Sequence, residues 1–374
     1  MLHYFLAPLS DRFVIFNLFN YITFRVAGAT VTAILIAFVI GPPVIERLRR
    51  FKIGQVIRAE GPASHHAKRG TPTMGGIIIL IATIVPTLLW ARWDNQNYVL
   101  IAVLATLWMG LIGFVDDYLK IVEGKSRGLI ARYKLVGQVL FGIGLGLVLL
   151  NFPTADNVQA NTITLPFFKY LLITLPPFIY LAFVTFVTAA MSNAVNLTDG
   201  LDGLAAGLTV IAAGSFAIFA YVFGRVDTSA YLLVYYLRGA GELSVFCTAL
   251  MGAALGFLWF NAHPAEVFMG DTGSLAIGGA LGTVAILLKS EFLLVIVCGV
   301  FVAEASSVLI QTTAYKYRKR TRGKEYADNH RVFRMAPLHH HFEKLGWHES
   351  KVVSRFLIMG ILCALLALST LKIR

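Results

Sequence analysis

The chain has 374 residues, of which 57% are hydrophobic and only 14% are charged, and its mean hydropathy is +0.72. Soluble domains carry about 25% charged residues, so the composition excludes a soluble globular protein and indicates a polytopic membrane protein. A net charge of +12 would suit nucleic-acid binding, but the cations gather in loops between apolar segments, so we expect no nucleic-acid partner.

The sequence predicts an all-α fold with about ten transmembrane helices, which form a single integral membrane domain over residues 1–374. A spanning helix needs about 20 mainly apolar residues. The predicted spans run over 23–45, 75–92, 98–117, 133–151, 170–190, 203–223, 243–261, 272–288, 292–315 and 352–371.

The charge distribution predicts how these spans are oriented. Most Lys and Arg residues lie in the loops that follow the first, third and ninth predicted spans. Because successive loops alternate between the two sides of the membrane, these three loops lie on the same side. Loops rich in Lys and Arg stay in the cytoplasm, so we expect this side to be cytoplasmic. An even number of spans then leaves both termini outside.

The first of these loops contains the run GPASHHAKRGTPTMGG over 61–76, directly before a predicted span. Lys68 and Arg69, beside glycine- and threonine-rich backbone at a helix start, are suited to binding phosphate. They equally suit a cationic anchor at the membrane surface, with glycines that allow close helix packing. Because the run has no P-loop pattern, its spacing leaves both interpretations open.

Asp116 and Asp117 end the apolar run that begins near Tyr98. Two adjacent carboxylates at the end of a hydrophobic helix are costly to desolvate and repel each other. A metal or phosphate site is therefore the first hypothesis. The alternative is an acidic pair that marks the point where a helix meets water.

The predicted loop over 191–204 lies between two spans and has no Lys or Arg at all. Its Asn196, Asp199 and Asp202, together with glycines, offer amides, carboxylates and permissive backbone for gripping a polar ligand. These are also ordinary turn residues, but their concentration favours a functional role.

The predicted loop over 261–274 has a similar composition and begins with Asn261. Its Asp271 lies near glycines at a helix start, where it can cap the helix or hold a hard cation. Phe268 in the same loop can stack on a planar ring or anchor the chain at the membrane interface.

Ionisable residues also mark the ninth span and the loop after it. Glu304 falls near the middle of the span predicted over 292–315, where an ionisable group is a functional candidate unless it is protonated or paired within the bundle. The loop ends with three histidines, His339, His340 and His341, which can hold phosphate, shuttle protons or bind a transition metal. Nearby cysteines and histidines four residues apart are missing, which argues against zinc.

The predicted topology brings the candidate groups together on one side of the membrane. Carboxylates able to hold Mg²⁺ and cations able to hold phosphate indicate phosphoryl-type chemistry at the membrane surface, with a soluble phosphate donor and a lipid acceptor. The groups on this side are Lys68, Asp116, Asp117, Asn196, Asp199, Asp202, Asp271, His339, His340 and His341.

Five ordered motifs resemble those of the MraY family, the bacterial phospho-N-acetylmuramoyl-pentapeptide transferases of the polyprenyl-phosphate N-acetylhexosamine-1-phosphate transferase superfamily. The resemblance extends over essentially the full chain. The motifs are HHAKRGTPTMGG over 65–76, GFVDD over 113–117, NLTDGLDG over 196–203, FMGDTGS over 268–274 and PLHHHFE over 337–343.

The resemblance implies transfer of phospho-MurNAc-pentapeptide from UDP-MurNAc-pentapeptide to undecaprenyl phosphate, which gives lipid I and UMP. It also implies Mg²⁺ as the cofactor, membrane lipids as surroundings, a homodimer with ten spans, and a location in the bacterial cytoplasmic membrane. The active site would face the cytoplasm.

The resemblance also assigns roles to the candidate residues. Asp271 and Asp117 would lie at Mg²⁺ and the diphosphate, and Asp116 would be the candidate base for the lipid phosphate. The remaining catalytic candidates are His339 and Lys68, which would contact or neutralise phosphate. The substrate-binding candidates are Asn196 and Asp199 in the nucleotide region, Asp202, Asn261 and Phe268 around uridine, His340 at the sugar-phosphate side, and His341 and His65.

Two other functions fit parts of the pattern. A transferase of GlcNAc-1-phosphate to a polyprenyl phosphate would share the aspartate motifs, although the motifs at 71–76 and 337–343 favour the muramoyl-pentapeptide enzymes. A lipid or solute transporter would place charged groups near the bilayer midplane and often has an internal repeat, whereas the acidic motifs here lie at one face.

Direct attack by the lipid phosphate and a two-step route through an aspartyl-phosphate both remain open.

Overall fold

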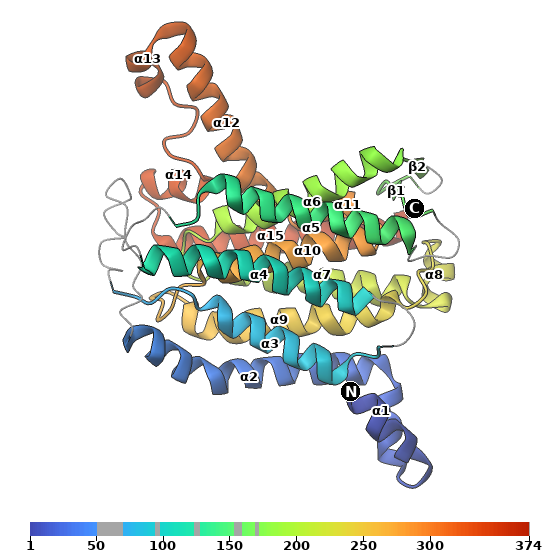
Figure 1. The fold of residues 1–374 in the computed structure, drawn as a ribbon. Helices are drawn as coiled ribbons and strands as arrows, with labels where there is room; N and C mark the ends of the chain where they lie inside the picture. The colour runs from blue at the N-terminus through green and yellow to red at the C-terminus, as the bar shows by residue number, and fades with distance from the viewer. Residues whose placement is uncertain (51–69, 94–97, 123–127, 153–158, 169–171, 374) are drawn as a thin grey trace.

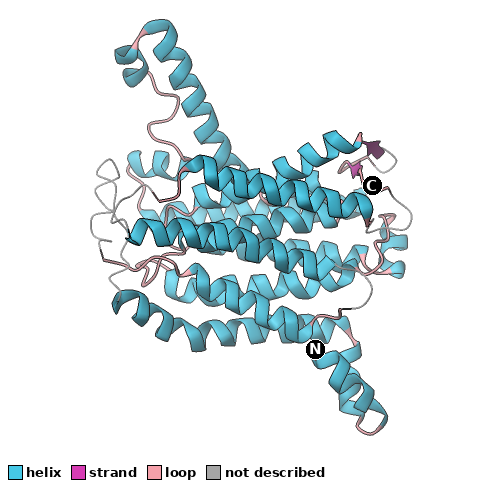
Figure 2. Cartoon of the chain, in the orientation of Figure 1, coloured by secondary structure: helices cyan, strands magenta, loops and turns pink. Residues whose placement is uncertain are grey.

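The computed structural model describes residues 1–50, 70–93, 98–122, 128–152, 159–168 and 172–373. Figure 2 shows that these residues are almost entirely helical, which confirms the predicted all-α fold. The long helices are α2 (Ile22–Arg50), α3 (Gly76–Trp90), α4 (Tyr98–Val122), α5 (Ala131–Asn151), α6 (Pro177–Thr198), α7 (Leu204–Phe223), α9 (Leu243–Asn261), α10 (Gly270–Leu287), α12 (Gly299–Arg322) and α15 (Glu349–Ile373).

Shorter elements connect these helices or precede them. Strands β1 (Thr162–Thr164) and β2 (Leu172–Thr174) form an antiparallel pair in which Ile163 lies opposite Ile173. The short helices are α1 (Leu2–Leu6), η1 (Ala7–Asp11), η2 (Val14–Asn20), α8 (Val226–Leu232), η4 (Ala240–Glu242), α11 (Glu291–Val297), α13 (Lys324–Asn329) and α14 (Leu338–Lys344).

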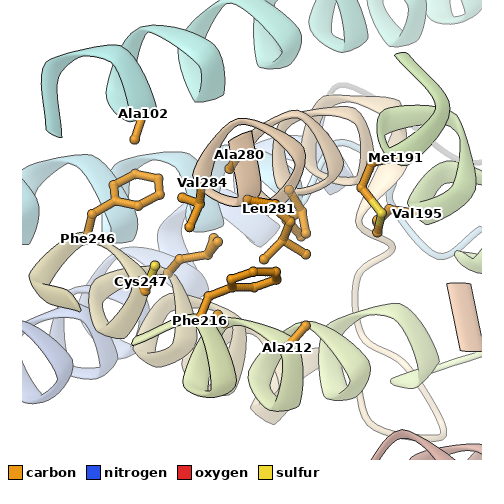
Figure 3. Packing of buried hydrophobic residues seen from close by; sticks show 14 of the residues in the cluster. Ala102, Met191, Val195, Ala212, Phe216, Phe246, Cys247, Ala280, Leu281 and Val284 are labelled. Carbon is orange, nitrogen blue, oxygen red and sulfur yellow. The ribbon is translucent and has the colours of Figure 1, made fainter. Parts of the chain in front are cut away.

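Helix α10 lies at the centre of the bundle. Every residue from 272 to 287 is buried, and the helix packs against α3, α4, α6 and α7. Figure 3 shows Leu281 and Val284 of α10 beside Phe216 of α7 and Phe246 of α9. The many glycines and alanines of α10 allow neighbouring helices to approach closely, as is usual in membrane bundles.

The described residues form a multi-pass membrane protein. Eight of their helical segments are long and apolar enough to cross a membrane, and the pair α11 and α12 counts as a ninth if it forms one bent span. The span predicted over 75–92 corresponds to α3, which has 15 residues. At 1.5 Å per residue it is about 22 Å long, against about 30 Å for the hydrocarbon core, so it falls short of the length we had expected.

The span predicted over 170–190 was placed too early in the chain. Residues 172–174 form β2, and α6 begins at Pro177 and continues to Thr198. The polar residues that we interpreted as the start of a loop remain helical because they have partners inside the bundle. Asn193, for example, donates to Gln138 Oε1 of α5 at 2.8 Å, which lets the helix extend through a polar stretch.

The span predicted as one helix over 292–315 is broken. Helices α11 and α12 meet at an angle of 87° around Cys298 and Gly299, and in Figure 1 α12 leans away from the main bundle. Glu304 therefore lies in the second turn of a new helix rather than in the middle of a straight span. No proline marks this break in the sequence.

The two ends of the bundle are distinct. Helix α10 runs from Asp271, beside Asp116 and Asp117, to Leu287, close to the β1–β2 pair, and we call these the carboxylate end and the hairpin end. The amino group of Met1 donates to backbone oxygens at the hairpin end of α3, and the C-terminal turn of α15 lies against α8 at the same end (Figure 1). The orientation of these ends in the membrane stays a prediction from the positive-inside rule.

Candidate functional site

Asp116, Asp117 and Asp271 form a compact group of carboxylates. Helix α4 supplies the first two and the first turn of α10 supplies the third, and one oxygen from each lies within 4.8 Å of the others. Asp116 and Asp117 are only 2% exposed. The tight contact depends on Gly270, whose φ is +73° and where a Cβ would lie 2.6 Å from an oxygen of Asp117.

Asp117 fixes the start of α10. Its Oδ1 accepts the backbone N–H of Asp271 at 3.2 Å, and its Oδ2 accepts the backbone N–H and the hydroxyl of Thr272 at 2.9 and 2.7 Å. The first N–H groups of a helix have no partner within the helix. Asp117 supplies that partner from a neighbouring helix and so holds Asp271 in place.

Two lysines face the three carboxylates. Lys134, from the first turn of α5, donates to Asp271 Oδ2 at 2.6 Å and lies 3.6 Å from Asp116 Oδ1. Lys120 pairs with Asp116 and lies 3.1 Å from Asp271 Oδ2 and 3.7 Å from Asp117 Oδ1. With all five side chains ionised, three carboxylates and two ammonium groups leave this cluster one negative charge in excess.

Asn196 and Asp199 extend the cluster onto α6. The amide of Asn196 donates to Asp271 Oδ1 at 2.8 Å and to Ser274 Oγ at 2.9 Å, which fixes the orientation of the Asp271 carboxylate. Asp199 follows the last residue of α6. Loss of hydration, together with the nearby carboxylates of Asp271 and Asp117, raises its pKa to about 8.

Asp202 belongs to a second group, with His263 and Glu349. Its Oδ2 lies 3.1 Å from His263 Nδ1 and accepts the backbone N–H of Ala265 at 3.1 Å. Glu349, at the start of α15, accepts the Asp202 backbone N–H at 2.9 Å. The three side chains lie close enough together to share a cation, and they tie the 199–203 turn to α15.

Asn261 and Phe268 hold neighbouring backbone segments together. Asn261 accepts the Gly203 backbone N–H at 3.0 Å and donates to the Val267 carbonyl at 2.9 Å, so its amide joins two of the predicted loops. The Phe268 backbone N–H donates to the Pro72 carbonyl, and its own carbonyl accepts the Gly75 N–H, both at 2.8 Å. Residues 70–76 of the first motif therefore lie beside the fourth motif, with the ring of Phe268 partly exposed.

The three consecutive histidines have different partners at Nδ1. His339 Nδ1 lies 3.2 Å from an oxygen of Glu304, and His340 Nδ1 lies 2.8 Å from an oxygen of Glu343. His341 Nδ1 instead accepts a backbone N–H, that of Arg334, at 3.1 Å. A run of identical residues is thus divided into three separate environments.

The structure brings most of the predicted residues to the carboxylate end, but not into one cluster. Asp116, Asp117 and Asp271 gather around the two lysines. Asn196 binds Asp271, and Asp199 interacts electrostatically with Asp271 and Asp117, whereas Asp202 and Asn261 lie with the second group. His341 contacts Phe333 and Arg334, which belong to the segment before α14. Lys68 and His65 lie outside the described residues.

The sequence did not single out Lys134, His263 or Glu349 as site residues. Lys134 is the clearest omission, since a lysine one residue inside the span predicted over 133–151 is a charged residue in an apolar segment. Glu349 stands just before the span predicted over 352–371, where a carboxylate near a helix start is common and carries no functional signal. Only the fold shows that its partners are Asp202 and His263.

The Asp116, Asp117 and Asp271 cluster fits a divalent cation. Carboxylate oxygens are the ligands that hard cations prefer, the three oxygens converge, and the excess negative charge calls for a further positive group. Asp271 is now paired with lysines and could exchange them for a cation. Asp117 Oδ1 accepts a single hydrogen bond, so it keeps a lone pair for the same ion.

Comparisons with known proteins agree with this geometry. Residues 99–289 match the model of glycosyl transferase family 4, and residues 68–80 match signature 1 of the phospho-N-acetylmuramoyl-pentapeptide-transferases. The chain is similar over its full length to proteins of that name from Gemmatimonas aurantiaca, at 60% identity, and Geobacter sp. (strain M21), at 50% identity; both entire relatives are covered. A relative of the same name from Koribacter versatilis is 51% identical over 98% of each chain.

Proposed function

The chain belongs to the phospho-N-acetylmuramoyl-pentapeptide-transferase family, and from this premise we propose that it transfers phospho-MurNAc-pentapeptide from UDP-MurNAc-pentapeptide to undecaprenyl phosphate. The products are lipid I and UMP. Three aspartates, two of them buried, that face two lysines at one end of a membrane bundle support this proposal most directly. Such a cluster offers both the anionic and the cationic groups that phosphoryl transfer requires.

In this reaction an oxygen of the lipid phosphate forms a bond to the sugar-linked phosphorus, and the bond from that phosphorus to UMP breaks. The lipid phosphate needs little activation, because its second pKa of about 6 leaves it largely ionised at neutral pH. The main tasks of the protein are then positioning and charge stabilisation.

The residues of the cluster divide these tasks. Asp271 and Asp117 are the proposed Mg²⁺ ligands, and the ion would supply positive charge next to the departing UMP. Lys120 and Lys134, which now pair with carboxylates, would neutralise phosphate oxygens when the substrates bind. Asp116 lies between both lysines and is the proposed base or orienting group for the lipid phosphate.

The residues around the 199–203 turn would hold the nucleotide. Asp202, Asn261 and Phe268 form the proposed uridine region, with the partly exposed ring of Phe268 stacking on uracil. Asn196 and Asp199 would lie between this region and the diphosphate. The hydrogen bond from Asn196 to Asp271 and the electrostatic effect of Asp271 and Asp117 on Asp199 support this position. His340, His341, His65 and Lys68 complete the proposed substrate contacts.

The proposal includes the location of the protein. As a member of this family it would lie in the bacterial inner membrane, with the carboxylate end in the cytoplasm, as the positive-inside rule predicts. It would function as a homodimer of single-domain chains. Light scattering of the detergent-purified protein would measure the dimer, and labelling of single cysteines at each end in intact cells would measure the orientation.

A comparison of sugar donors in detergent tests the function. The purified protein is given undecaprenyl phosphate, Mg²⁺ and either UDP-MurNAc-pentapeptide or UDP-GlcNAc, and UMP release is measured. The proposal predicts rapid UMP release when the donor is UDP-MurNAc-pentapeptide but not when it is UDP-GlcNAc. Preference for UDP-GlcNAc would assign the chain to the related sugar-phosphate transferases, and release in detergent would exclude transport as the sole function because no sealed compartment is present.

A further inference from the structure

Glu304 of α12 and His339 of α14 form a buried pair. Both residues are 0% exposed. Glu304 Oε1 accepts the backbone N–H of His339 at 3.1 Å and lies 3.2 Å from the Nδ1 atom of the same residue. One carboxylate oxygen therefore faces two nitrogen atoms of a single histidine.

The surroundings of the ring decide where its proton lies. A carboxylate oxygen is an acceptor only, so Nδ1 is stable beside Glu304 only when it carries a proton. Nε2 points toward Gly200, where an added Cβ would collide with the ring nitrogen. Among the described residues neither ring nitrogen makes a hydrogen bond of regular geometry, so electrostatics decide the tautomer. The Glu304 oxygen 3.2 Å from Nδ1 favours a proton there, and the Cα of Gly200 beside Nε2 offers no competing acceptor.

The pair also connects two parts of the carboxylate end. Glu304 and Gln311 lie two helical turns apart on α12, and both bind backbone of the segment that leads to the histidines. Gln311 Oε1 accepts the N–H groups of Val332 and Phe333 at 3.1 and 3.0 Å. His339 in turn packs beneath the turn that contains Asp199 and Gly200.

We infer that Glu304 and His339 are a positioning pair: Glu304 keeps the histidine proton on Nδ1, and the ring then supports the Asp199–Gly200 turn with an unprotonated Nε2. In this arrangement His339 acts on the substrate through Asp199 rather than by direct contact. This effect on turnover rests on the proposed function, whereas the tautomer can be tested without any substrate.

The neighbouring histidine provides an internal comparison. His341 Nδ1 accepts the Arg334 backbone N–H, so a neutral His341 must carry its proton on Nε2. The two histidines are two residues apart and are expected to have opposite tautomers. A method that reports both in one spectrum therefore contains its own reference.

Nitrogen NMR of the full chain, labelled with ¹⁵N-histidine in detergent at pH 8, tests the inference. Exposed histidines are neutral at this pH, and the signals of His339 and His341 among the nine histidines are assigned by difference from His339→Gln and His341→Gln. We expect the Nδ1–H form for His339 and the Nε2–H form for His341. A proton on Nε2 of His339 in the unmodified protein would overturn the inference, whatever substrate the enzyme uses.

Two variants of similar size separate positioning from packing. Glu304→Gln retains an oxygen that can accept from Nδ1–H, and it is expected to keep the tautomer and most of the turnover. Glu304→Met fills the same space without a good acceptor, and it is expected to shift the tautomer. We also expect kcat to fall about 10- to 100-fold, as when a metal-binding histidine loses the hydrogen-bond partner of its other ring nitrogen. KM for the UDP-sugar should change less than kcat.

Gln311→Ala is the matched control for the segment, because it loosens the same backbone without touching His339. It is expected to leave the His339 tautomer unchanged. An unchanged tautomer in Glu304→Met, or equal loss of turnover in Glu304→Gln and Glu304→Met, would overturn the positioning role.

Discussion

Both ends of the bundle bury charged side chains, but only one end balances them. At the hairpin end, Arg25 and Glu242 form a bidentate pair at 2.5 and 2.6 Å, and backbone groups of Trp90 and Arg92 complete it. At the carboxylate end, three aspartates face two lysines. The Arg25–Glu242 pair is neutral overall and is therefore a structural contact. The cluster of three aspartates and two lysines has excess negative charge and can still bind a cation.

The comparison predicts that the hairpin end contributes stability and not turnover. Arg25→Met leaves the partly buried carboxylate of Glu242 without its cation, which should lower the free energy of unfolding by about 3 kcal/mol, the lower end of the range for a fully buried pair. Turnover per folded molecule should not change. Unfolding in detergent, followed alongside kcat, measures both quantities.

The double variant Arg25→Met with Glu242→Met is the control for this prediction. It removes both charges, so most of the lost stability should return. A single variant as stable as the unmodified protein would show that the pair is not structural, and a large fall in kcat would break the comparison between the ends.

The carboxylate end should respond in the opposite way. Asp271→Asn keeps the size of the side chain but removes the charge proposed to hold the cation, and kcat should fall about 10²- to 10³-fold. The protein should remain folded, because Asp117 still binds the start of α10 through backbone N–H groups. Turnover at several Mg²⁺ concentrations measures the effect, and a variant with normal activity would refute the metal assignment.

Lys134→Met should have the next largest effect, because it removes a cation proposed to neutralise a phosphate oxygen. Loss of a charge-assisted hydrogen bond to phosphate should reduce kcat by a factor that corresponds to about 1.5–3 kcal/mol. Lys134→Arg retains the charge with a different shape, and its kcat should lie between that of the unmodified protein and that of Lys134→Met. Equal activity in all three proteins would make Lys134 a structural partner of Asp271 only.

Phe268→Ala should have the smallest effect. Loss of stacking on a planar base costs about 0.5–1.5 kcal/mol beyond the lost contact area, so KM for the UDP-sugar should rise several-fold. KM for undecaprenyl phosphate should stay the same, and Phe268→Tyr should behave like the unmodified protein. A matching rise in both KM values would argue against base stacking.

The sequence predicted the helical class and the gathering of the acidic motifs because both depend on local signals. Apolar runs of spanning length define the helices, and polar residues at span ends accumulate on one side when the loops alternate. Asp116, Asp117 and Asp271 were found in this way. Their proximity in the structure confirms that the motifs from α4 and α10 meet.

Features that depend on tertiary contacts could not be predicted. The polar end of α6 stays helical because Gln138, Asp271 and Ser274 bind its side chains. The 87° bend before α12 has no proline to mark it, so Glu304 was assigned to the middle of a span. Its partner, His339, lies 35 residues further along the chain, beyond any local pattern.

The most direct test of the account is UMP release by the purified protein from UDP-MurNAc-pentapeptide, with and without undecaprenyl phosphate and Mg²⁺, in the unmodified protein and in Asp116→Asn. We predict release that requires both the lipid and Mg²⁺ and that Asp116→Asn largely abolishes. Release without the lipid would point to an enzyme-bound intermediate or to hydrolysis. No release from a well-folded preparation would contradict the claim that the unbalanced charge cluster is the centre of this transfer reaction.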